Sequence, residues 1–370
     1  MANFINEKLI IDDIIEELSK YGLNYSGNVF GTVRESISAE VLSSLIRKAS
    51  ALHLKMVKIS EPFISQERLL KSHPYIGSVS RPDIVICDTE NYTFKVVEFN
   101  IDAAIGYIVE SSIITEVCNK YNNTNFPIPS KEFSRFLRDI MIKEKKEGIL
   151  LIEINNAPLQ KRKVTNALKI SLMNENLPVT VMEPEDILRN KPTSQILIRT
   201  SALLSIDDAI VTGLVEIEKK YFVLNGTECL ATNNKSLLRT DFNDLEDITL
   251  RCLPCDLWKP TYFEDVVLKH VLSNKGKLVF VKKEIDNEEW ENHYQKALND
   301  ADNWIIQEYA HGNTTQICCN NQVVSGQLLL SLFFFGECET GFLIRGSLGK
   351  NRKILHPGDA NTVFVVPVLG

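Results

Sequence analysis

The sequence lacks a hydrophobic stretch long enough to cross a membrane. Its longest apolar run, Leu328–Phe335, covers eight residues, whereas a membrane-spanning helix needs about 20. The first residues also lack the basic segment, apolar core and small-residue cleavage site of a secretory signal. These absences argue against membrane insertion and predict a cytoplasmic protein.

An excess of basic residues is missing as well. The 41 lysine and arginine residues are outnumbered by 48 aspartate and glutamate residues, which gives a net charge of −7. Proteins that bind nucleic acids by neutralising phosphates normally carry a basic excess. The sequence therefore predicts no nucleic-acid partner.

The eight cysteines are scattered, and buried or loop thiols are the expectation, with a metal or redox role for Cys252 and Cys255 as the alternative. Cys252 and Cys255 have the spacing of a zinc knuckle, but no second Cys pair or His pair follows at a suitable interval. We therefore expect reduced thiols, as in other cytosolic proteins.

The chain has the composition of a globular protein with more than one core. It contains 370 residues, of which 44% are hydrophobic and 24% are charged. Apolar periodicity and turn residues predict helices at about 10–18, 38–49, 107–121, 131–146, 164–176, 233–241 and 287–298, and strands at 83–87, 94–100, 149–154, 178–182, 196–199, 265–269, 278–283 and 304–307. Strands that alternate with helices over 148–225 indicate a small open α/β layer.

The strands 83–87 and 94–100 predict a hairpin with an acidic patch. Because alternate residues of a strand share a face, Glu98 and Asn100 project together, and the hairpin register sets Asp83 opposite Glu98. Two carboxylates and an amide oxygen suit Mg²⁺, which would also offset the repulsion between the carboxylates. The alternative is an exposed polar strand face.

A second candidate segment carries lysines and one glycine. Lys269 ends a predicted strand, and the polar loop that follows contains Gly276 and Lys277. Backbone amides of such a loop can cover phosphates, and a lysine can supply a point charge to them. The Gly-Lys-Ser/Thr signature of a Walker loop is absent, and a surface hairpin that happens to carry lysines is the alternative.

The segment Gln307, Glu308 and Tyr309 follows an apolar strand. Its backbone could read the edge of an adenine ring. An edge strand without a ligand explains the same residues.

Taken together, these segments resemble the ATP-grasp superfamily in circularly permuted form. The nearest branch contains eukaryotic glutathione synthetase, glutathionylspermidine synthetase and permuted amino-acid ligases of natural-product pathways. The run from Arg81 to Ile86 is similar to that branch's Arg-x-Asp strand, and Lys95–Gly106 is similar to its Glu-x-Asn strand. Gly341–Ser347 resembles the arginine strand that ordinarily comes just before this hairpin. Here it comes last, which indicates the permutation.

The resemblance implies a role for each matching residue. Asp83, Glu98 and Asn100 fall at the Mg²⁺–ATP positions, and the nucleotide positions are Lys235, Lys269, Gly276, Lys277, Gln307, Glu308 and Tyr309. Arg81 and Arg345 fall at catalytic positions that contact phosphate or substrate. Structural ion pairs are the alternative for both arginines, and a solvated helix lysine is the alternative for Lys235.

The resemblance also implies an α+β and α/β fold with four parts. Residues 1–147 would hold the N-terminal helices and the metal-binding half of the ATP-grasp core, and 148–226 an inserted Rossmann-like domain. Residues 227–312 would form the lid and nucleotide-binding subdomain, and 313–370 the rest of the core. One departure from the family is the phosphate loop, which has a single glycine where the family often has three or more.

The implied function is an ADP-forming ligase that uses ATP and Mg²⁺ to join a carboxylate to an amine, or to a thiol, through an acyl phosphate. Arg199, on what the sequence suggests is the central strand of the middle domain, is a candidate for binding a substrate carboxylate, with a buried salt bridge as the alternative. The expected partners are an amino acid, a peptide or a carrier-bound substrate, and a homodimer follows from the habit of the family. The rival hypotheses are a non-catalytic binding protein on the same scaffold and an ATP-using enzyme without a carboxylate substrate.

Overall fold

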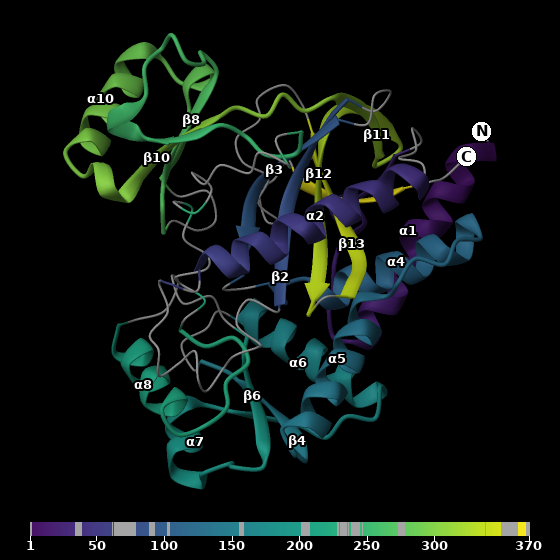
Figure 1. The fold of residues 1–370 in the computed structure, drawn as a ribbon. Helices are drawn as coiled ribbons and strands as arrows, with labels where there is room; N and C mark the ends of the chain where they lie inside the picture. The colour runs from purple at the N-terminus through teal and green to yellow at the C-terminus, as the bar shows by residue number, and fades with distance from the viewer. Residues whose placement is uncertain are drawn as a thin grey trace.

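Three β-sheets and the helices packed against them make up the described part of the chain in the computed structural model (Figure 1). The structure describes residues 2–33, 39–60, 62, 79–88, 93–101, 104–154, 159–200, 208–227, 229, 235, 237, 245, 247–272, 278–336, 338–348 and 362–367. A seven-stranded sheet lies between two lobes, one with a four-stranded sheet and one with a three-stranded sheet.

The seven-stranded sheet joins strands from both ends of the chain. Its order is β11-β1-β14-β13-β12-β2-β3. The strands are β1 (Phe30–Val33), β2 (Val79–Asp88), β3 (Thr93–Asn100), β11 (Thr314–Cys319), β12 (Gln322–Phe335), β13 (Cys338–Leu348) and β14 (Thr362–Pro367). β1 and β14 pair in parallel, whereas β12 pairs antiparallel with β13, β2 and β11.

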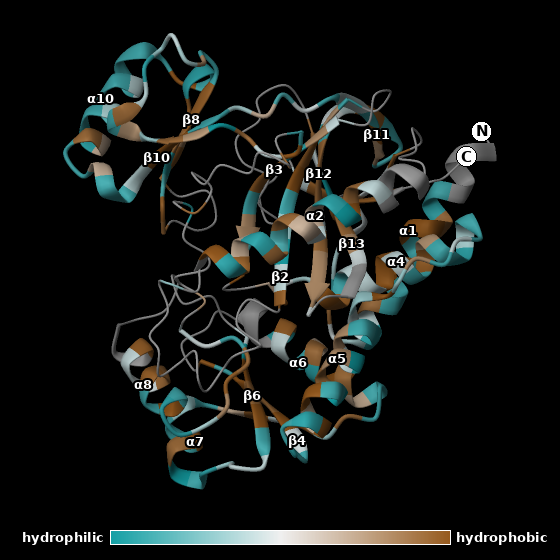
Figure 2. Cartoon of the chain, viewed as in Figure 1, coloured by the Kyte–Doolittle hydropathy of each residue, from teal (hydrophilic) through white to brown (hydrophobic). Residues whose placement is uncertain are grey.

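Helices cover both faces of this sheet. They are α1 (Ala2–Lys20), α2 (Ala39–Ser60), α4 (Ile108–Asn122) and α5 (Pro129–Lys143). Leu343 and Phe364 share a buried cluster with residues of α1, α4 and α5, whereas Leu330 and Val365 share another with residues of α2. Because strand residues alternate between faces, β12 is hydrophobic on both sides over most of its length (Figure 2).

The four-stranded sheet belongs to the lobe that contains α10 (Asn287–Leu298). Its strands are β7 (Cys252–Pro254), β8 (Val266–His270), β9 (Val279–Val281) and β10 (Trp304–Glu308), in the order β7-β10-β8-β9. Asp286 caps α10 by accepting the N–H of Glu289 at 2.7 Å. Trp258 and Trp290 pack edge to face in the small core of this lobe.

The three-stranded sheet is entirely parallel. β4 (Gly148–Ile152) lies between β5 (Val179–Met182) and β6 (Gln195–Arg199). Crossover helices are needed between parallel strands, and α6 (Leu159–Asn174) and α7 (Pro184–Asn190) supply them, followed by α8 (Asp208–Glu218).

A short segment before β7 ties the four-stranded lobe to β3. The N–H of Val96 donates to the Ile248 carbonyl oxygen at 2.8 Å, and Lys95 Nζ donates to the Thr249 carbonyl oxygen at 2.8 Å. The Arg251 carbonyl oxygen accepts the N–H of Glu308 at 2.8 Å. The ends of β7 and β10 are therefore connected to the edge of the seven-stranded sheet.

Most predicted elements within the described residues are confirmed, and α10 has its predicted bounds. One strand is shorter than predicted, because β9 ends at Val281 and residues 282–284 form a 3-10 helix. The predicted helix at 233–241 lies mostly outside the described residues. Across the part of the chain that the structure describes, no helix combines the length and hydrophobicity of a membrane span.

Candidate active site

The strand register places a row of polar residues across the seven-stranded sheet. Asp83 on β2 pairs with Glu98 on β3, as predicted, and on its other side with Ser331 on β12. Directly paired residues share a face of the sheet, so the three side chains lie in one row. Asp83 is only 7% exposed, so the alternative of an exposed polar face is wrong for this residue.

Asp83 is held by hydrogen bonds to both of its carboxylate oxygens. Ser331 Oγ donates to Oδ1 at 2.5 Å, and Arg345 Nη2 lies 2.9 Å from the same oxygen. Asn100 Nδ2 donates to Oδ2 at 3.1 Å. Burial alone would raise the pKa of Asp83, but the charges of Arg345 and Arg81 outweigh it and hold the pKa below its usual value.

Arg81 lies beside this pair and is also buried. Its Nη1 donates to the Gly106 carbonyl oxygen at 2.7 Å, its Nε lies 3.9 Å from Asp83 Oδ1, and its guanidinium lies 5.9 Å from the centre of the Tyr107 ring. Burial lowers the pKa of Arg81, and Asp83 opposes that shift. The predicted ion-pair alternative is thus observed for both arginines, since both contact Asp83.

Two buried lysines reach the same row from the side of the four-stranded sheet. Lys235 Nζ lies 3.3 Å from Glu98 Oε1, and the N–H of Lys235 donates to the Val271 carbonyl oxygen just after β8. Lys235 is 4% exposed, so the alternative of a solvated lysine is wrong.

Lys269 on β8 crosses from the four-stranded sheet to the seven-stranded sheet. Its Nζ donates to Gln307 Oε1 at 2.6 Å and to the Val97 carbonyl oxygen of β3 at 3.2 Å. Burial lowers the pKa of Lys269 to about 8, an effect that nearby Glu98 opposes and Lys235 adds to. The surface-hairpin alternative is wrong for Lys269, because this lysine is buried.

The network has more positive than negative groups. Its cations are Arg81, Lys235, Lys269 and Arg345, and its carboxylates are Asp83 and Glu98. Ion pairs that are buried retain a strong field, because water screens them little. The excess of buried positive charge suits an anionic ligand such as a phosphate or a carboxylate.

The donors present fit a magnesium ion that is held partly by phosphates. Both N–H groups of Asn100 are used, since Nδ2 donates to Asp83 Oδ2 and to the Arg81 carbonyl oxygen, so its amide oxygen points elsewhere. The second oxygen of Asp83 keeps a lone pair, and Glu98 is only partly buried. No group of three or more His, Cys, Asp or Glu side chains suited to a metal occurs among the described residues, and Mg²⁺ bound with phosphates needs only one or two carboxylates.

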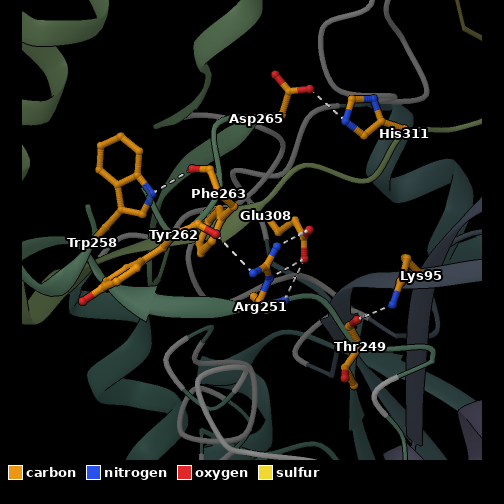
Figure 3. Close-up of polar contacts among 9 residues, drawn as sticks. All are labelled: Lys95, Thr249, Arg251, Trp258, Tyr262, Phe263, Asp265, Glu308 and His311. Carbon is orange, nitrogen blue, oxygen red and sulfur yellow. Dashed lines mark hydrogen bonds and ion pairs between the residues drawn. The ribbon is translucent and has the colours of Figure 1, made fainter. Parts of the chain in front are cut away.

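The segment at the end of β10 is held by a network of its own (Figure 3). Arg251 binds both carboxylate oxygens of Glu308, at 3.0 Å and 3.3 Å, and also donates to the Tyr262 carbonyl oxygen. Arg251 lowers the pKa of Glu308, although burial partly opposes this. β10 lies inside its sheet, so the edge-strand alternative is wrong.

The backbone N–H groups of Glu308 and Tyr309 already donate hydrogen bonds within the protein. The N–H of Glu308 donates to the Arg251 carbonyl oxygen, and the N–H of Tyr309 donates to the Asp265 carbonyl oxygen at 2.9 Å. Asp265 also pairs with His311 at 2.8 Å (Figure 3). An adenine ring that bound here would have to form hydrogen bonds with backbone carbonyl groups or with residues after Tyr309.

Arg199 lies in the three-stranded lobe rather than in the charge network. It ends β6, which flanks the central strand β4, so its expected place on the central strand is wrong. Asn225 fixes the Arg199 backbone, accepting its N–H and donating to its carbonyl oxygen, both at 2.8 Å. The remaining predicted residues, Gly276 and Lys277, lie outside the described residues.

Some residues of the site were not predicted from the sequence. Ser331 and Arg251 are the clearest examples. The signal for Ser331 was visible, because it is the one polar residue in the apolar run Leu328–Phe335. Arg251 had no such signal, since its partner Glu308 lies 57 positions away.

Comparisons with known proteins support the fold. No protein-family model and no curated protein sequence matches the chain. A glutathione synthetase-like effector from Globodera pallida, solved in its apo form, matches with a TM-score of 0.61 at 12% identity, over 98% of this chain and 96% of the other. A protein assigned as a gamma-glutamylcysteine synthetase from Methylobacillus flagellatus KT matches with a TM-score of 0.46 at 11% identity, over 91% and 89%. Because the second score is low, only the first match bears on the fold, and this chain has a fold similar to that of the Globodera pallida effector.

Proposed function

We propose that the chain is an ATP-dependent, ADP-forming carboxylate–amine ligase with a circularly permuted ATP-grasp fold. One observation carries the proposal. Lys269 and Lys235 from the four-stranded side, and Arg81 and Arg345 from the seven-stranded side, surround the Asp83–Glu98 pair. Cations on two sides of a carboxylate pair suit a nucleotide triphosphate with its metal ion.

In this proposal the carboxylate substrate attacks the γ-phosphate of ATP, which yields an acyl phosphate and ADP. The amine then displaces phosphate and forms the amide. Magnesium, held by Asp83, Glu98 and Asn100, would screen the charge of the phosphates. The protein needs no nucleophile of its own for this chemistry, since positioning and charge stabilisation supply most of the catalysis.

The lysines and arginines would share the charge that develops during transfer. Lys269 and Lys235 would contact the nucleotide phosphates. Gln307, Glu308 and Tyr309 would lie beside the adenine ring. Arg345 and Arg81 would stabilise the transferred phosphoryl group or orient the carboxylate. All four cations are buried, and charges in a site of low dielectric act more strongly than in water.

The substrate side of the proposal uses the three-stranded lobe. Ligands of open α/β sheets bind beyond the carboxyl ends of the strands, and Arg199 lies at such an end. We place a carboxylate of the acid or amine substrate there. Carrier-bound acceptors and a thiol in place of the amine remain candidates of the same reaction class.

The test is calorimetric titration with a non-hydrolysable ATP analogue, with and without Mg²⁺. Binding that depends on magnesium and is lost in Glu98→Gln, while the variant keeps the wild-type unfolding curve, is the expected result. Hydroxylamine trapping then reports the acyl phosphate with an active acid. Absence of analogue binding in either condition would overturn the nucleotide site.

A non-catalytic binding protein on the same scaffold is the second candidate. The observation that favours it is that Asp83 already accepts three hydrogen bonds, from Ser331, Arg345 and Asn100. A carboxylate that is occupied by an arginine is a weaker metal ligand. Analogue binding that is insensitive to Mg²⁺, with no ADP release across a screen of acids and amines, would favour this candidate.

A further inference from the structure

One fully buried glutamate has no part in the proposed reaction. Glu110, in the first turn of α4, is 0% exposed. Its Oε1 accepts the hydroxyl hydrogen of Tyr25 at 2.8 Å, whereas its Oε2 is buried without a hydrogen-bond partner. A buried carboxylate with so few donors is costly in its charged form.

Glu110 lies close in the chain to the Gly106–Tyr107 turn, which binds Arg81. The residue just before α4, Tyr107, has a φ of 65°, in the left-handed region. The carbonyl oxygen of the preceding residue, Gly106, accepts a hydrogen bond from Arg81 Nη1 at 2.7 Å. A non-glycine residue keeps such a conformation only where its surroundings enforce it.

Aromatic contacts connect Tyr107 in this turn with Tyr25 through Phe364. The Tyr107 ring packs against Phe364 at a centroid distance of 5.8 Å, and Phe364 packs against Tyr25 at 5.9 Å. Tyr25 is also the hydrogen-bond donor to Glu110. Glu110 and Tyr25 therefore brace the turn on which Arg81 rests.

The charge of Glu110 matters because Arg81 lies within electrostatic range. The titratable and charged groups that face Glu110 are Tyr25 after α1, Tyr107 at the start of α4 and Arg81 on β2. Burial raises the pKa of Glu110, and its own N–H, Tyr25 and Arg81 offset only part of that shift. An ionised Glu110 would compete with an anionic ligand for Arg81, whose Nε is buried without a hydrogen bond.

We propose that Glu110 is a positioning residue that, as a neutral carboxylic acid, braces the Gly106–Tyr107 turn and leaves the charge of Arg81 to the anionic ligand of the site. The role assigned to that ligand rests on the proposed function. The protonation state and the link to Arg81 do not, so they can be tested separately.

The protonation state is read without any ligand. Infrared difference spectra between wild type and Glu110→Gln at neutral pH should show the carbonyl band of a protonated carboxylic acid that shifts in D₂O. Tyr25→Phe should keep the band, because loss of the Tyr25 hydrogen bond raises the pKa further. A wild-type spectrum without the band would overturn the proposal.

The link to Arg81 is tested by unfolding and by ligand affinity. Glu110→Gln should unfold at the wild-type denaturant midpoint, while Glu110→Ala should lower it, and its effect should not add to that of Arg81→Met. With the Mg²⁺-bound ATP analogue as probe, Glu110→Gln should stay within about threefold of wild type and folded Glu110→Ala should lose about tenfold or more. The proposal would be overturned if the midpoint shifts of Glu110→Ala and Arg81→Met were additive. It would also be overturned if Glu110→Gln bound the analogue as weakly as Glu110→Ala does. Failure of the wild type to bind the analogue would count against the proposed function alone.

Discussion

Lys269 Nζ lies 3.2 Å from the Val97 carbonyl oxygen, so a side chain of the four-stranded sheet binds the backbone of the seven-stranded sheet. The same ammonium group donates to Gln307 at 2.6 Å and lies within electrostatic range of Glu98. One charge therefore links the two sheets and contributes to the cationic side of the candidate site. An approaching phosphate would meet a lysine that has already been positioned.

Binding of a nucleotide should weaken on the alkaline side because of Lys269. Its pKa is lowered to about 8 by burial, so the side chain is a cation below that pH and becomes neutral above it. A bound phosphate favours the cation and raises the pKa again. We expect the affinity for the ATP analogue to be level up to about pH 7 and to fall about tenfold for each pH unit well above the pKa of the free protein.

Lys269→Arg is the matched control for this effect, because arginine keeps its charge throughout the range. Calorimetry in buffers of different ionisation enthalpy should show proton uptake on binding near pH 8 for wild type only. Equal proton uptake by the two proteins would contradict the assignment to Lys269.

Removal of the charge on Asp83 should destabilise the fold. In Asp83→Asn, Arg81 and Arg345 keep their positive charges without their shared carboxylate, and the new amide N–H faces Asn100. Breaking a buried ion pair costs about 3 to 5 kcal/mol. Urea unfolding should show this loss at pH 7, and Asp83→Asn/Arg345→Met should lose less than the sum of the single variants.

The acid limb supplies an independent check on the same residue. Because the pKa of Asp83 is lowered in the folded state, its contribution is present above the unfolded value of about 4 and is lost as the pH falls through the folded pKa. Wild type should therefore lose stability in this range, and Asp83→Asn should lose less. Identical slopes in the two proteins would show that Asp83 is not responsible.

Protonation of His53 should destabilise the protein at a higher pH than protonation of Asp83 does. It is buried on α2, its Nδ1 lies 2.7 Å from Ser80 Oγ, and its ring stacks on Phe334. Burial lowers the pKa of His53 to about 4 from 6.5, so the folded protein disfavours the proton that the unfolded chain accepts. The free energy of unfolding should fall by about 3 kcal/mol as the pH drops from 6.5 to about 4.

Two variants separate the titration of His53 from its packing. His53→Gln should flatten the pH dependence in this range, whereas Ser80→Ala should lower stability and leave the slope in place. The measurement is urea unfolding at a series of pH values. A slope that survives in His53→Gln would assign the effect to another group.

The parts of the site that were predictable depend on short-range patterns. The alternation of residues in 83–87 and 94–100 was enough to predict the pairing of Asp83 with Glu98, and the observed register confirms it. The helix 287–298 was predictable for a similar reason, because its cap and periodicity are local signals. The match with the Globodera pallida effector supports the mixed α/β architecture that was expected.

The parts that were not predictable depend on distant segments. Ser331 reaches Asp83 from 248 positions away, and no local pattern encodes such a pairing. The long strand β12 was read only as an apolar run, because hydrophobicity on both faces removes the alternation that marks a strand. The charge state of each group also depends on burial, which the sequence does not specify.

Loss of Arg251, which directly precedes β7, should weaken nucleotide binding more than folding. Arg251 is 62% exposed and binds Glu308 through two nitrogens (Figure 3). Exposed ion pairs contribute at most about 1 kcal/mol, so Arg251→Ala should shift the unfolding midpoint little. Glu308 would lose the two hydrogen bonds from Arg251 that orient its carboxylate beside the proposed adenine position. We therefore expect the analogue to bind about three- to tenfold more weakly.

Two controls distinguish orientation of Glu308 from a general effect of charge. Arg251→Lys keeps the charge but cannot form the two parallel contacts, so it should resemble Arg251→Ala. Arg189→Ala removes another exposed arginine, one that pairs with Asp186 on α7 in the three-stranded lobe, and should bind as wild type does. If Arg251→Lys instead restores wild-type affinity, the charge at this position matters and the geometry of the Arg251–Glu308 pair does not.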